Sequence, residues 1–175
     1  MKRFFPILLI ISTLINMFTL GIYRRSMKYD KHQAIFSILT YMDHLKSFNE
    51  YIDIYLEEPD NADILNILFD QENEMVKIVT NTNYYALKKM KPLYTSLISI
   101  NVQANSLVLK CKEGLDSRED IGYINNNLKE IISYLDEIQS DMLSDKIESD
   151  YLVKNQLLVS SNINEILERN KHFID

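Results

Sequence analysis

Near the middle of the chain, lysine and tyrosine side chains gather in the densest basic patch outside the N-terminal region. This Tyr/Lys cluster comprises Tyr84, Tyr85, Lys88, Lys89, Lys91 and Tyr94. Tyrosine supplies stiff amphipathic contact area, and lysine supplies positive charge. The cluster therefore predicts a surface that binds a ligand carboxylate, an acidic polymer or a partner protein. The alternative is ordinary packing of the rings, with their hydroxyl tips in water.

Residues that commonly carry catalysis or hold metals form no recognisable pattern. The three histidines, His32, His44 and His172, do not have the i, i+4 spacing of a helical metal site. No zinc-protease, nucleophile-elbow, phosphate-loop or EF-hand motif occurs. We therefore predict a protein that is not an enzyme and that uses no metal and no cofactor.

One acidic group could hold a cation, and it consists of Glu57, Glu58, Asp60 and Asp63. Carboxylates that converge in a loop can bind calcium, but this group lacks the glycine turn and the alternating ligand spacing of such loops. Helix capping and solvation are the preferred interpretation.

Cys111 is the only cysteine, so neither an intramolecular disulfide nor a cysteine-based metal cluster is possible. Its neighbours Lys110 and Lys112 would lower the pKa of an exposed thiol. We favour the alternative, in which Cys111 is a small buried hydrophobic residue.

The element most clearly marked by the sequence is an apolar run from Phe4 to Tyr23, which holds no charged residue. Lys2 and Arg3 precede it, and Arg24 and Arg25 come directly after it. A helix of about 20 residues spans about 30 Å, the thickness of the hydrocarbon core of a bilayer. We predict that residues 1–25 form a transmembrane anchor that contacts lipid through residues 4–23.

A cleaved signal peptide is the alternative for this segment. Its apolar region would normally be shorter and would end in small residues. Here large residues such as Phe18 and Leu20 continue close to the end of the run, which favours an uncleaved signal anchor. Basic residues after the run slightly favour a cytoplasmic domain by the positive-inside rule. The secretory layout favours export of the residues after the anchor, and we predict an extracytoplasmic domain.

Residues 26–175 are acidic, because four of the 19 basic residues flank the apolar run while all 25 acidic residues lie after it. This balance argues against nucleic acid as a partner. The length suits one hydrophobic core. Glycine and proline number only three each, and such scarcity of turn residues favours long helices.

Apolar spacing of three and four residues predicts helices throughout this region. The first should continue without a break from the anchor to about Glu57, where Glu58-Pro59 stops it. Asp60 is the predicted N-cap of the second helix, with Asp63 at N3. That helix weakens at residues 80–83.

Pro92 either opens a third helix near Lys91 or bends a continuous one. This helix should end near Gly114, and Ser117 with Asp120 resembles a capping box for the next. Its predicted apolar positions are Leu93, Leu97, Ile98, Ile100, Val102, Leu107, Val108 and Leu109.

The next helix has a strict heptad seam, formed by Ile121, Ile124, Leu128, Ile131, Leu135, Ile138 and Met142. We favour packing of this seam within the chain over a coiled-coil pair with a second copy. A break at residues 144–150 should precede a last helix. The apolar residues of that helix are Leu152, Leu157, Leu158, Ile163, Ile166, Leu167 and Ile174.

The predicted fold is all-α, with a single transmembrane helix followed by an antiparallel bundle of four to five helices at residues 26–175. In gross layout the chain resembles the membrane-tethered four-helix sensory modules of bacterial chemoreceptors, in which an anchor runs into a long outer helix. The chain lacks their second membrane span and signalling region, so the resemblance implies an architecture and no site residue.

The predicted function is that of an extracytoplasmic binding, assembly or sensing module with a protein partner or with self-association. The alternative is a cytoplasm-facing adaptor that regulates an integral membrane protein.

Overall fold

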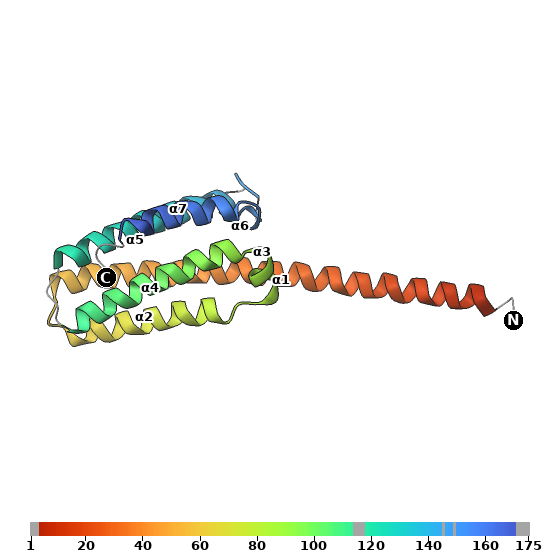
Figure 1. The fold of residues 1–175 in the computed structure, drawn as a ribbon, viewed down its shortest axis with the longest axis horizontal. Helices are drawn as coiled ribbons and strands as arrows, with labels where there is room; N and C mark the ends of the chain where they lie inside the picture. Colours follow the sequence, from red (N-terminus) through yellow and green to blue (C-terminus); the bar gives the residue numbers. More distant parts are fainter. Residues whose placement is uncertain (1–3, 114–117, 145, 149, 171–175) are drawn as a thin grey trace.

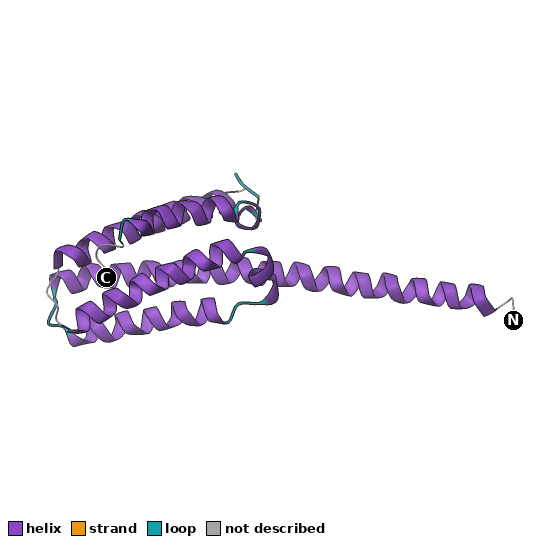
Figure 2. Ribbon diagram, in the orientation of Figure 1, coloured by secondary structure: helices purple, strands orange, loops and turns teal. Residues whose placement is uncertain are grey.

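A computed structural model of the chain describes residues 4–113, 118–144, 146–148 and 150–170. Side chains are described from Ser12 onward, apart from those of Tyr84, Leu87 and Glu113. Regular structure in these residues is entirely helical (Figure 2), as predicted. The helices are α1 Phe4–Glu57, α2 Ala62–Thr80, α3 Tyr84–Lys89, α4 Lys91–Glu113, α5 Arg118–Leu143, α6 Tyr151–Lys154 and α7 Gln156–Glu168.

The long helices close into a ring, in which each contacts the next in the order α1, α2, α4, α7, α5 and back to α1. Helices α1, α4 and α7 run away from the end where α1 enters the bundle, and α2 and α5 run back toward it (Figure 1). The predicted helical bundle is therefore confirmed. Neighbours are antiparallel except α4 and α7, because a ring with an odd number of rods cannot alternate direction throughout.

Helix α1 is a single helix of 54 residues, and it ends at Glu57 as predicted. Its C-terminal part belongs to the bundle, where Ile38, Leu45 and Ile52 are fully buried. Its N-terminal part extends beyond the bundle as a separate rod (Figure 1). Within the residues that the structure describes, none of the helices is both long and apolar enough to cross a membrane.

The start of α2 differs from the prediction by one residue. Asn61, not Asp60, is the N-cap, and its side-chain oxygen accepts a hydrogen bond from the Asp63 backbone N–H at 3.1 Å. Both residue types cap helices well, so the choice depends on where the backbone turns after Pro59. Asp63 is consequently at N2 and not at N3.

The weak stretch after α2 breaks the helix, because α2 ends at Thr80 and Asn83 caps the short helix α3. Pro92 opens a new helix, since α4 begins at Lys91. This resolves the alternative in favour of a start and not a kink, in agreement with the preference of proline for the first turn. The predicted roles of Gly114 and Ser117 lie outside the described residues.

The heptad seam of α5 packs within the chain, against α1 and α7. All its members from Ile121 to Ile138 are buried, and Met142 packs partly buried at its edge. In the last segment, Leu152, Ile163 and Leu167 are buried as predicted. Leu157 and Leu158 are exposed, because they lie on the outer face of α7, and their assignment to the core was wrong. Ile174 lies outside the described residues.

Buried polar pairs join α7 to α4. The Ser96 and Ser160 hydroxyl oxygens lie 2.7 Å apart. Gln103 donates from Nε2 to the Leu167 carbonyl oxygen at 3.0 Å and accepts from Asn170 Nδ2 at 2.5 Å. Satisfied polar groups in a core favour one register, because any slip would leave them buried without partners.

Candidate functional site

The Tyr/Lys cluster lies at the end of the bundle where α1 emerges, on α3 and the first turns of α4 (Figure 1). We call this the anchor-side end. Asn83, the N-cap of α3, donates from Nδ2 to the Asp30 backbone oxygen of α1 at 2.9 Å. This bond fixes the position of α3 along the axis of α1, beside Asp30. Lys88, Lys89 and Lys91 are all exposed there.

Two tyrosines of the cluster, Tyr85 and Tyr94, do not supply the predicted contact surface. Tyr85 and Tyr94 are both buried, with 9% and 4% of their surface exposed. The Tyr94 hydroxyl donates to the Ala34 backbone oxygen at 3.3 Å, and burial raises the pKa of Tyr94 to about 12. These rings face the core because their helix positions match its apolar stripe. The side chain of Tyr84 lies outside the described part of the chain, and among the described side chains of the cluster the exposed ones are the three lysines.

Several ion pairs lie at the anchor-side end, around the segment between α5 and α7. Lys31 Nζ lies 2.7 Å from Asp150 Oδ2 and so joins α1 to the start of α6. The hydrogen bond from Lys31 lowers the pKa of Asp150 to about 2. Lys154 forms ion pairs with Glu148 and Asp150.

The opposite end of the bundle is acidic, and we call it the distal end. Glu57, Glu58, Asp60 and Asp63 lie around the α1–α2 junction, and their side chains are exposed. The N-cap of α2 is Asn61 and not one of these carboxylates; the Glu58 carboxylate accepts a hydrogen bond from Asn61 Nδ2 at 3.2 Å. Among the described side chains, no group of three or more histidine, cysteine or acidic residues is placed to hold a metal.

A groove of about 370 Å³ between α2 and α4 was missed by the sequence patterns. Its walls include Val76, Ile98 and Val102, and Glu72 and Asn101 supply polar groups. Ile98 and Val102 are about half exposed, at 51% and 59%, so their prediction as core residues was wrong. They lie four residues apart, and this spacing off the main stripe is the signal that marks a second apolar face.

Glu72 is the unusual residue of this groove, because it is a buried carboxyl with 6% of its surface exposed. Burial raises the pKa of Glu72 above its ordinary value. Close by, the Tyr41 hydroxyl lies 2.7 Å from Asn101 Oδ1. The pKa of Tyr41 is also raised, mainly by burial and further by the charge of Glu72. One carboxyl in an apolar groove suits binding of an apolar group that carries a hydrogen-bond donor.

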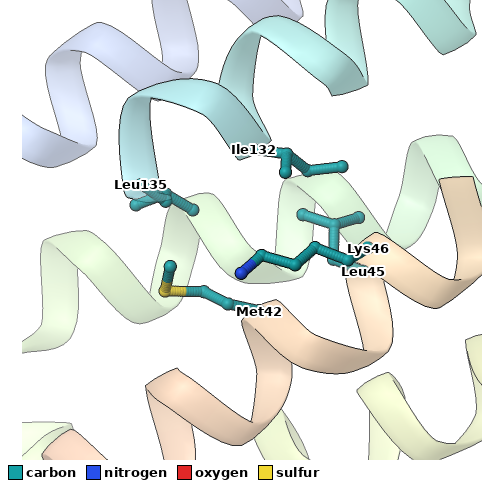
Figure 3. A pocket seen from close by; sticks show the side chains of 5 residues that line it. All are labelled: Met42, Leu45, Lys46, Ile132 and Leu135. Atoms are coloured by element: carbon teal, nitrogen blue, oxygen red, sulfur yellow. The ribbon is translucent and has the colours of Figure 1, made fainter. Parts of the chain in front are cut away.

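The contact between α1 and α5 is packing and not a binding pocket. Figure 3 shows Met42 and Leu135 facing each other, with Lys46 and Ile132 beside them. The space among these side chains has no room for a water molecule. Lys46 spans it with its apolar stem and places Nζ 2.5 Å from Asp136 Oδ1.

Cys111 is buried, as predicted. Burial raises the pKa of its thiol to about 11. The thiol is therefore protonated at neutral pH. The alternative of a lysine-activated thiolate is wrong because it required an exposed thiol, and burial disfavours the charged form.

Comparison of the chain with protein-family models, curated proteins and solved structures finds no match.

Proposed function

We propose that the chain is a non-enzymatic, single-pass membrane protein that presents its helical bundle outside the cytoplasm as a binding, assembly or sensing module. Residues 1–25 form the anchor and residues 26–175 form the domain. The observation that carries this proposal is the continuity of α1, which runs from the apolar segment into the bundle core without interruption.

Exposure of the rod outside the bundle supports a lipid environment for it. Leu14, Phe18 and Ile22 each expose more than half of their surface. Contiguous apolar surface of this kind is unfavourable in water at roughly 25 cal/mol per Å². The apolar run begins at Phe4, before the first described side chain. A bilayer would cover the whole run, and Arg24 and Arg25 would lie among the headgroups.

Binding is preferred to catalysis because of the chemistry of the α2–α4 groove. Glu72 is the one ionisable residue among those lining the α2–α4 groove. Active sites commonly combine an acid or base with a nucleophile or a group that stabilises developing charge. A groove with a single carboxyl supports recognition of a ligand or partner instead.

Two measurements on the full-length protein test the proposal. We expect the protein to stay with membranes during extraction at alkaline pH, whereas release into the supernatant would contradict the anchor. We also expect protease to remove a tag placed after Asp175 in intact cells or spheroplasts. A tag that is digested only after lysis would overturn the extracytoplasmic domain and favour the alternative of a cytoplasm-facing adaptor.

A further inference from the structure

We propose that Lys88, Lys89 and Lys91 contact the anionic headgroups of the same membrane that holds α1, so that the anchor-side end of the bundle rests on the lipid surface. This inference depends on the proposed membrane anchor. It replaces a protein partner for the surface lysines with a lipid one.

The level of α3 along α1 brings these lysines close to the membrane. Asn83 binds the backbone oxygen of Asp30, and the apolar run ends at Tyr23. The helix between Tyr23 and Asp30 rises about 10 Å. Headgroups occupy about 5–8 Å of that distance on each side of the hydrocarbon core. A flexible lysine side chain at the level of α3 therefore lies within reach of the headgroup layer.

Packing of α3 keeps the lysines on the surface. Ala86 and Met90 are fully buried, so they hold α3 and the start of α4 against the core while Lys88, Lys89 and Lys91 remain exposed. The chain reverses direction at this point, because α2 arrives at the anchor-side end and α4 leaves from it (Figure 1). The lysines thus occupy a turn at the extremity of the bundle and not its flank.

Charge at the anchor-side end is complementary to an anionic surface. The nearby carboxylates Glu148 and Asp150 are occupied by ion pairs with Lys154 and Lys31. The exposed side chains of Arg24, Arg25 and Lys28 add positive charge on α1, on the N-terminal side of the position that Asn83 contacts. Lysine and arginine near an anionic bilayer are attracted within a Debye length, about 10 Å at moderate salt.

The direction of α1 keeps the distal end away from the membrane that holds the anchor (Figure 1). The distal end carries the exposed acidic residues Glu57, Glu58, Asp60 and Asp63 together with the exposed basic residues Lys112 and Arg118, so its charge is mixed. Leu143 and Leu157, by contrast, lie at the anchor-side end of α5 and α7 and expose 78% and 71% of their surface. A headgroup layer would take up both the positive charges and these apolar side chains.

Lysine acylation in vesicles tests the contact with the full-length, unmodified protein. The protein is reconstituted in phosphatidylcholine alone and in phosphatidylcholine with about 30% phosphatidylglycerol. A water-soluble amine-reactive ester then labels exposed lysines, and mass spectrometry measures each rate relative to Lys112, which is exposed on α4 toward the distal end. We expect Lys88, Lys89 and Lys91 to react about threefold more slowly in the anionic vesicles, and about 1 M salt to abolish the difference.

A second measurement uses charge reversal. Backbone hydrogen exchange over residues 84–94 should be slower in anionic than in neutral vesicles, and the triple variant K88E/K89E/K91E should lose this difference. The matched control K110E/K112E/R118E reverses the same number of charges toward the distal end and should keep it.

The outcomes separate this inference from the anchor itself. If the three lysines react as fast in the anionic vesicles as in the neutral ones while the protein stays inserted, the headgroup contact is overturned and the anchor remains. If they react slowly relative to Lys112 in both kinds of vesicle, another part of the protein covers them, and the headgroup contact is overturned as well. Failure of the protein to float with either vesicle would contradict the anchor, and the headgroup contact with it.

Discussion

Among single residues, Glu72 is the one whose chemistry conflicts most with its surroundings. Its carboxyl is buried beside Tyr41, and burial raises its pKa. A carboxyl with a raised pKa stabilises the fold only while it is protonated, so its contribution is lost as pH rises above its ordinary value of 4.5 and through the raised value. A buried carboxylate destabilises the fold at neutral pH, and its presence in the α2–α4 groove is a reason to test this groove for binding.

Replacement of Glu72 by glutamine should raise the melting temperature at pH 7, because the buried charge is removed. The gain is about 2–4 °C for each kcal/mol recovered. Below pH 4.5, where the wild-type carboxyl is neutral, the two proteins should melt alike. Glu74→Gln is the matched control, since Glu74 is paired with Lys77 on the surface and its pKa is lowered. A similar gain in both variants would contradict this account of Glu72.

Leu128→Asp should unfold the domain or destabilise it by about 3–5 kcal/mol, because it places an unpaired charge in the core. Leu128 is completely buried in the α5 seam. Leu143→Asp on the same helix is the control, since Leu143 is exposed and should change stability by no more than about 0.5 kcal/mol. Circular dichroism during thermal unfolding measures both, and unchanged melting of the Leu128 variant would show that the seam faces solvent.

At the scale of elements, α1 has two parts, one packed in the bundle and one that extends beyond it. Its first buried side chains are Ala34 and Ile35, so the helix before them is held by its own hydrogen bonds and by few contacts with the bundle. Helix stability in the free segment therefore depends on helix propensity and on its surroundings, whereas in the bundle it depends on packing.

Proline substitutions in α1 should separate these two parts. Ser37→Pro lies within the bundle and should cost about 3 kcal/mol or more, because it removes a backbone hydrogen bond and distorts a packed helix. Ser26→Pro lies before the first buried residues and should leave the unfolding of the bundle in denaturant almost unchanged. Equal losses of unfolding free energy in the two variants would show that the stability of the bundle depends on the part of α1 before Met27.

The short helix α6 is joined to α1 by the ion pair between Lys31 and Asp150. The pKa of Asp150 is lowered from 3.8 to about 2, so the pair stabilises this junction above pH 3.8 and is lost as pH falls to about 2. Hydrogen exchange of the backbone amides of α6, corrected for intrinsic rates, should accelerate over that window. Asp150→Asn should have the same effect at pH 7.

Lys31→Gln provides the partner control for this junction. It should account for most of the acceleration that Asp150→Asn causes in α6, because Lys31 is the closer partner at 2.7 Å and Lys154 lies 3.3 Å from Asp150. The double variant should exchange about as fast as Asp150→Asn alone, since both substitutions remove the Lys31–Asp150 pair. Additive effects would mean that Asp150 acts mainly through Lys154.

As a whole molecule, the bundle closes its core within one chain. Each long helix of the ring contacts two others, and the α5 seam packs inside the ring. Surface lysines Lys88, Lys89 and Lys91 lie at the anchor-side end, and the acidic group at the α1–α2 junction lies at the distal end. Closure buries the core of the ring within one chain.

Thermal unfolding of the protein in detergent should therefore have a midpoint that does not change when the protein concentration rises about tenfold. A domain that depends on a second copy would melt at higher temperature when more concentrated, by mass action. Such a shift would contradict closure of the core within one chain.

Local patterns in the sequence were sufficient for several of the helices. At Pro92 they left a new helix and a bend as alternatives, and the structure has a new helix. The continuity of α1 to Glu57 and the seam of α5 result from apolar period, proline stereochemistry and the scarcity of turn residues. These are properties of neighbouring residues, so they can be recognised without knowledge of the rest of the fold.

Contacts between distant segments determined which apolar residues are buried and which surface residues lie together. The helical period identifies an apolar face of a helix but not the helix that covers it. Packing of α3 and α4 against α1 turns Tyr85 and Tyr94 inward, and the closure of the ring leaves Leu157 and Leu158 outside. The Asn83–Asp30 bond places the lysines of α3 beside the segment that leaves the bundle. Residues separated by more than fifty positions meet there only after the ring has formed, so their shared location could not be inferred from spacing along the chain.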